Sequence, residues 1–145
     1  MSKTKKVINE LLVEIFNHIL AIEEEELKKS GLNLSMNEVH TLEAIANSDE
    51  PTMSNIAKKM RITTGTLTTN INRLVNKKYV TRHVDPNDRR RVFLELTDSS
   101  REVLKQHDKF HDEMIESLFQ DLPIEEDEVL MKSLENIANY FKEKY

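Results

Sequence analysis

The segment from residue 52 to residue 97 contains closely spaced patterns that leave few folds open. Thr52 and Thr63 each stand directly before a short stretch with helical apolar spacing, where a threonine hydroxyl can cap a helix. Only a brief turn at Arg61 and Ile62 separates the two stretches, which predicts two short helices in a helix-turn-helix arrangement. Polar and apolar residues then alternate on both sides of a turn at residues 85–88, which predicts a β-hairpin. The order helix, helix, hairpin predicts a winged helix-turn-helix.

Long helical patterns flank this segment. Apolar residues recur at spacings of three and four over residues 5–30, which predicts a long amphipathic helix. Ser35 and Glu38 form the reciprocal capping pattern of a second helix over residues 36–46. Two more helices are expected after residue 98. The first should end at Leu122, because Pro123 disfavours helix in the residue before it, and the last should begin at about Glu125.

The terminal helices carry wide apolar stripes that lie outside the small central module. Such stripes must be buried, and a bundle formed by both ends of two chains would bury them in a symmetric homodimer. A monomer whose terminal helices cover the central module is the alternative. The expected fold is mainly α-helical with a small β-hairpin wing. Its parts are an N-terminal dimerisation helix, a winged helix-turn-helix domain and C-terminal dimerisation helices, over residues 1–34, 35–97 and 98–145.

Charge is distributed unevenly along the chain. Residues 52–101 contain 11 Lys and Arg against four Asp and Glu, a net charge of +7, whereas the remainder carries −12. A basic middle between acidic ends is expected when one segment faces a polyanion such as DNA. The absence of cysteine excludes disulfides and thiolate metal sites and suits a reducing cytoplasm. No apolar run approaches the roughly 20 residues of a membrane span, and the N-terminal stretch does not read as a signal peptide.

The helix that follows Thr63 has an outward face suited to DNA. With Leu67 directed inward, the 100° step per residue turns small hydrogen-bonding side chains outward and basic ones after them. A threonine offers a hydroxyl to a base edge and a methyl group to thymine, and a glycine permits close approach. Lysines near the helix end most simply contact phosphates. The predicted DNA contacts on this helix are Thr64, Gly65, Thr66, Thr68, Thr69, Asn72, Arg73 and Lys77.

The hairpin turn sets three arginines beside two acidic residues. A hairpin tip is narrow enough to enter a minor groove, where negative potential attracts arginine. Asp88 stands two residues from Arg90 and can fix that side chain by a charge-assisted hydrogen bond. Asp88, Arg89 and Arg90 are therefore predicted DNA contacts. The alternative is a solvated turn held by its own weak ion pairs.

The run Asp-Pro-Asn-Asp-Arg-Arg-Arg-Val-Phe-Leu-Glu-Leu-Thr at residues 85–97 resembles the wing signature of the MarR family, and the likeness extends over nearly the whole chain. One departure is Ser99-Ser100, where a glycine is usual shortly after the Leu-Thr pair. The resemblance implies a dimeric repressor of transcription that binds palindromic operator DNA and needs no cofactor. It also implies that Arg90 enters the minor groove, that Asp88 holds it, and that residues 65–73 contact the major groove. An enzyme is not expected, since the chain has no glycine-rich phosphate loop and no cysteine nucleophile.

Residues 13–24, 38–45 and 63–74 are similar to a narrower group, the FabT subfamily, which represses fatty-acid synthesis genes. Its corepressor is a long-chain acyl group on acyl carrier protein. This resemblance implies an apolar tunnel between the dimerisation helices and the second helix. The candidate lining residues are Phe16, Ile19, Ile22, Met36, His40, Phe110, His111 and Met114. The alternative is that most of these are ordinary core residues.

The histidines suggest another effector. His107 and His111 are four residues apart, so they face the same way on a helix. Together with His40 and Glu24, or its neighbour Glu23, they contain the ligand types of a tetrahedral zinc site. This pattern resembles zinc-sensing MarR regulators. The alternative is that these histidines form hydrogen bonds to neighbours or line an effector pocket.

Overall fold

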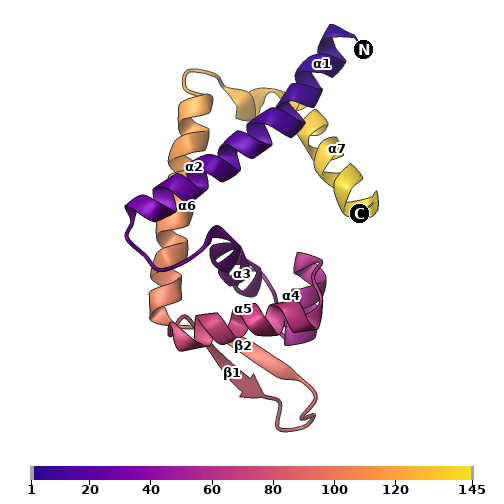
Figure 1. Ribbon diagram of the computed structural model, residues 1–145. Helices are drawn as coiled ribbons and strands as arrows, with labels where there is room; N and C mark the ends of the chain where they lie inside the picture. Colours follow the sequence, from indigo (N-terminus) through magenta and orange to yellow (C-terminus); the bar gives the residue numbers. More distant parts are fainter. Residues whose placement is uncertain (1, 145) are drawn as a thin grey trace. The chain divides into compact units, whose positions relative to one another are not determined.

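A computed structural model describes residues 2–144 (Figure 1). It is mainly helical with one two-stranded antiparallel sheet, as the sequence predicts. Among the described residues, no helix is both long and apolar enough to cross a membrane. The elements in order are α1 (Lys3–Glu10), the π-helical turn η1 (Leu11–Ile15), α2 (Phe16–Lys29), α3 (Met36–Ala46), α4 (Met53–Met60), α5 (Thr64–Asn76), β1 (Val80–Val84), β2 (Val92–Leu96), α6 (Asp98–Leu118), the 3₁₀ turn η2 (Ile124–Glu126) and α7 (Glu128–Lys144).

The chain divides into two compact units, one up to Leu104 and one from Lys105 onwards. The core of the first unit is formed by apolar side chains from α3, α4, α5, the hairpin and the first two turns of α6. Leu42, Ile56 and Leu67 are completely buried in it. Val103 and Leu104 also belong to this core, so the winged module packs beyond the predicted end at residue 97.

Side-chain caps fix where the helices of the winged module begin. The Ser35 Oγ accepts a hydrogen bond from the Glu38 N–H at 3.1 Å, and a Glu38 carboxylate oxygen accepts one from the Ser35 N–H at 2.9 Å. Thr52 and Thr63 cap α4 and α5 by accepting from the backbone N–H three residues ahead, each at 3.1 Å. Since each cap satisfies otherwise unpaired N–H groups, all three predicted helix starts are confirmed. Arg61, with a left-handed φ of 58°, makes the tight turn between α4 and α5.

The predicted hairpin is present, and its register places Val80 opposite Leu96 and Val84 opposite Val92. The strand β2 is tied to the loop before α4. The Leu94 N–H donates to the Pro51 carbonyl at 2.8 Å, and Phe93 forms a β-bridge with Thr52. These bonds anchor the wing to the helix-turn-helix.

The structure differs from the predicted helices in three places. The N-terminal helix is interrupted by the π-helical turn at Leu11–Ile15. α6 ends at Leu118, before the predicted Leu122, and Asp121 adopts a left-handed φ of 67°. α7 begins at Glu128 and not at Glu125, because the Asp127 carboxylate caps it by accepting from the Leu130 N–H at 3.0 Å.

Candidate nucleic-acid interface

The outward face of α5 is open to solvent. The buried residues of α5 are Leu67, Asn70, Ile71 and Leu74. The predicted contacts Thr64, Gly65, Thr66, Thr68, Thr69, Asn72 and Arg73 are all exposed. A Cβ added at Gly65 would meet only the Thr63 hydroxyl oxygen, at 3.9 Å, so packing within the chain does not require a glycine there. The absence of a side chain at Gly65 thus leaves room for an external partner.

The threonine hydroxyls of α5 donate within the helix. Thr68 donates to the Thr64 carbonyl at 2.8 Å, and Thr69 donates to the Gly65 carbonyl at 3.3 Å. Thr63 donates to the Thr66 hydroxyl at 2.9 Å. The hydroxyl protons of Thr68 and Thr69 are directed to carbonyls. Each of these side chains therefore presents the lone pairs of its hydroxyl and its methyl group outward. These groups suit the exocyclic amino group of adenine or cytosine and the methyl group of thymine.

At the wing, the predicted pair of Asp88 and Arg90 is present. One Asp88 carboxylate oxygen lies 3.1 Å from the Arg90 Nε and 3.0 Å from its backbone nitrogen, and the other lies 3.4 Å from Nη2. The Arg90 side chain is nevertheless 91% exposed, so it is oriented without being covered. Arg89 is also exposed.

Arg91 is held differently from its two neighbours. It is ion-paired with Glu50 and with Asp85, the latter at 3.5 Å, and its guanidinium lies 5.2 Å from the centre of the Phe93 ring. These contacts fasten the turn end of the hairpin to the loop before α4. The arginine run therefore separates into two outward cations and one that stabilises the wing.

Lys77 requires a correction. It was predicted to contact phosphate, but its Nζ lies 3.0 Å from both carboxylate oxygens of the buried Glu38. The Lys77 side chain is only 26% exposed. The bond joins the C-terminal end of α5 to the first turn of α3, so Lys77 holds α5 against α3 instead of extending outward.

We expect the Glu38 carboxylate to make stability depend on pH. Burial raises its pKa, but hydrogen bonds from Ser35 and the charge and hydrogen bond of Lys77 outweigh burial and leave the pKa below the ordinary 4.5. A lowered folded-state pKa means that this stabilisation is complete above the unfolded pKa and is lost as the pH falls through the folded pKa. At neutral pH, Glu38→Gln should lower the free energy of unfolding by about 1–3 kcal/mol. In urea titrations the difference between variant and wild type should shrink below about pH 4.5; a constant difference down to pH 3 would contradict this.

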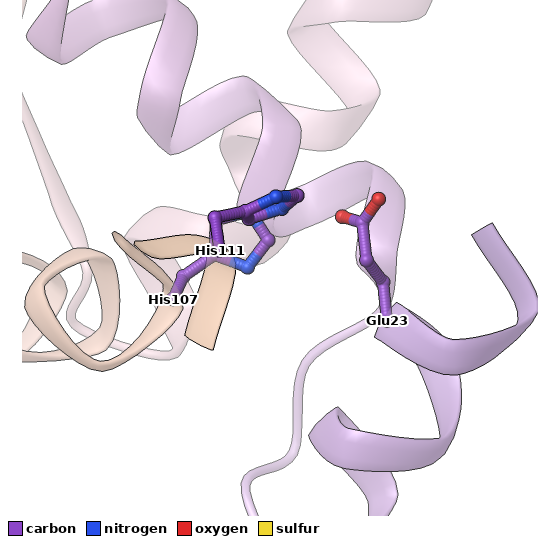
Figure 2. A group of neighbouring side chains, drawn as sticks. All are labelled: Glu23, His107 and His111. Atoms are coloured by element: carbon purple, nitrogen blue, oxygen red, sulfur yellow. The ribbon is translucent and has the colours of Figure 1, made fainter. Parts of the chain in front are cut away.

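The structure changes which acidic residue pairs with the predicted histidine ligands. In the first unit, the His40 Nε2 lies 3.3 Å from a carboxylate oxygen of Glu23, which is 6% exposed. Glu24 is exposed, so the carboxylate that meets His40 is that of Glu23 and the choice of Glu24 was wrong. In the second unit, the rings of His107 and His111 lie edge-on with centres 4.5 Å apart. Figure 2 shows these two rings on α6 and the Glu23 side chain on α2.

The predicted effector residues differ in burial. In the first unit, Met36 is a core residue and Ile19 is half-buried, whereas Phe16 and Ile22 are 58% and 42% exposed. In the second unit, Phe110, His111 and Met114 are half-buried. For Met36 the alternative of an ordinary core residue holds, since it packs in the hydrophobic core.

The sequence did not predict that Arg82 lies beside a candidate DNA contact. Arg82 on β1 is exposed and donates a hydrogen bond from Nη2 to the Oδ1 of Asn72 on α5. The partners are ten residues apart and lie on different elements. The only sequence signal was a polar, outward position in the first strand of the hairpin.

Comparison with known proteins gives consistent matches. The MarR family model matches residues 34–92. The chain is 35% identical to Streptococcus pneumoniae FabT, solved in complex with DNA, with 97% of this chain and 99% of that chain covered and a TM-score of 0.85. It is 25% identical to AbsC, a MarR family transcriptional regulator from Streptomyces coelicolor, over 99% and 98% of the chains, with a TM-score of 0.74.

A curated relative is the uncharacterized HTH-type transcriptional regulator YdgJ of Bacillus subtilis. It is 27% identical over 110 residues, which cover 76% of this chain and 66% of the length of YdgJ. The helix order, the hairpin and the near-complete overlap with the pneumococcal protein agree with one another. The chain therefore belongs to the MarR family of transcriptional regulators, which are not enzymes.

Proposed function

We propose that the protein is a homodimeric repressor that acts in the cytoplasm and binds a palindromic operator. Each α5 would enter a major groove, the two about 34 Å apart, with each wing in a flanking minor groove. The observation that carries this proposal is the pairing of an open, polar α5 face with an outward arginine held by Asp88. A protein-binding adaptor has no need of that combination. The pneumococcal relative, which was solved with DNA bound, supports the same reading.

The proposed dimer rests on apolar faces that one chain leaves uncovered. Along α1, η1 and α2, exposed fractions of 41–58% occur at Val7, Ile8, Leu11, Leu12, Val13, Ile15, Phe16 and Ile22. In the second unit, Leu118, Leu122, Val129, Leu134, Ile137 and Phe141 are exposed by 38–77%. Soluble monomers rarely leave so many large apolar side chains exposed. A second copy of the chain, which carries the same faces, would cover them.

For the effector, we propose a long-chain acyl group carried on acyl carrier protein, which strengthens operator binding and so controls fatty-acid synthesis genes. Support comes from the FabT-like segments and from 35% identity to FabT over 97% of the chain. A corepressor must bind the DNA-competent geometry more tightly than the other geometry, because only a difference in affinity shifts the balance.

Zinc is the second candidate effector. It is favoured by two preformed ligand pairs, the imidazoles of His107 and His111 in one unit and the buried Glu23 with His40 in the other. Nitrogen and carboxylate ligands of this kind suit tetrahedral zinc. If zinc uses the pair on α6, alanine at His111 should weaken zinc binding.

One experiment tests these proposals together. Fragmented genomic DNA is selected by the full-length protein and sequenced, first alone and then with acyl carrier protein, long-chain acylated carrier protein or zinc. We expect a palindrome to be enriched. Of the three additives, only the acylated carrier protein should increase the enrichment. Recovery of no motif above the background would contradict the repressor. A motif that responds to zinc, but not to the acylated carrier, would assign the effector role to the metal.

A further inference from the structure

The hydrogen bond between Arg82 and Asn72 joins the wing to the exposed face of α5. Arg82 is the third residue of β1, opposite Leu94 in the hairpin, and Asn72 lies in the second half of α5. Both side chains are exposed in the free protein. The bond therefore lies at the surface that faces DNA in the proposed function, and the inference below rests on that proposal.

The chemistry of the two side chains fixes the orientation of the amide. A guanidinium has only donors, so the Asn72 atom that it contacts must be the oxygen, Oδ1. The oxygen end of the amide is thus directed toward β1. Its NH₂ end, which can only donate, remains for a base. An unrestrained asparagine would instead offer both ends and form the paired contact to adenine N6 and N7.

We propose that Arg82 determines the base preference of Asn72 by holding its amide in one orientation. Held in this way, Asn72 acts as a donor and reads acceptors in the major groove, such as guanine N7 and O6 or thymine O4. The two-bond contact to adenine is disfavoured because the guanidinium keeps the oxygen that this contact requires turned toward β1. Arg82 is thus a positioning residue that acts through Asn72, and its remaining N–H groups stay available to a phosphate.

The test compares the base preferences of variants by selection from a pool of random-sequence duplexes, followed by sequencing. Asn72→Ala first identifies the operator position that depends on Asn72. At that position Arg82→Met should shift the ratio of adenine to guanine or thymine by about tenfold toward adenine, at the low end of the discrimination of a paired base contact. Preferences at the other positions should not change. Loss of a phosphate contact alone would weaken binding uniformly across sequences.

Two further variants keep the test decisive. Arg101→Met removes an exposed arginine that is paired with Asp98 on α6, so it controls for loss of one positive charge, and its base preferences should match wild type. Asn72→Asp keeps an acceptor for Arg82 and removes the NH₂ donor, so it should lose the wild-type preference even if Arg82→Met folds poorly. Retention of the wild-type preference in Asn72→Asp would overturn the inference.

The outcomes separate the inference from the function on which it rests. If Asn72→Ala changes one position and a folded Arg82→Met keeps the wild-type ratio there, the positioning role is wrong and the docking of α5 stands. If Asn72→Ala changes no position while the protein still selects a motif, the proposed docking of this part of α5 fails as well. Thermal melting of each variant reports whether the fold is kept.

Discussion

Leu134→Glu should convert the protein into a monomer that has lost nearly all specific affinity for its operator. Leu134 lies on α7 in the second unit and is 45% exposed in the single chain, next to Ile137 and Phe141 on the same stripe. A carboxylate buried without a partner in the dimer interface costs several kcal/mol. A monomer also loses the effective concentration that joins two half-sites, which is worth about 10²–10⁴ in affinity.

Light scattering coupled to gel filtration measures the mass, and fluorescence anisotropy with the selected operator measures the affinity. Ser133→Glu is the matched control, because it introduces the same charge at an exposed polar position one residue away. The control should remain dimeric and bind normally. A Leu134→Glu protein that is still a dimer with wild-type affinity would remove this face of α7 from the proposed interface.

Arg90→Ala should weaken operator binding about tenfold without unfolding the protein, which would match loss of roughly 1.4 kcal/mol. Its side chain is 91% exposed and already oriented by Asp88, so no core contact is lost. The negative potential of a narrow minor groove attracts such a cation. The slope of log affinity against log salt should fall by about 0.9 for each phosphate no longer neutralised, or about two for a dimer.

Asp88→Asn separates orientation from charge at the same site. It keeps Arg90 but replaces the carboxylate that holds the side chain, so its loss of affinity should be smaller than that of Arg90→Ala. Circular dichroism checks the fold of both variants. Equal affinities for wild type and Arg90→Ala at fixed salt would remove Arg90 from the role proposed for it.

Local rules allowed much of the fold to be predicted. Ser35, Thr52 and Thr63 mark helix starts because a cap acts on N–H groups two or three residues away. The hairpin was predicted because alternation and the turn are also local properties. The start of α7 was missed because Asp127, and not an earlier residue, supplies the cap.

The errors at the candidate site concern partners distant in sequence. Lys77 is a lysine near a helix end, as a phosphate contact would be, yet it is held by Glu38, 39 residues earlier. Arg82 was overlooked because its partner Asn72 lies on another element. Glu23 and Glu24 are adjacent and chemically identical, so only the position of His40 decides between them.

By itself, the sequence determined the order of the elements, the caps of the winged module and the family, because these depend on residue spacing along the chain. The tertiary structure decided which charged side chains face outward and which are held within the fold. That decision depends on distances between residues far apart in sequence, since an ion pair or a hydrogen bond forms only where folding brings its two partners together.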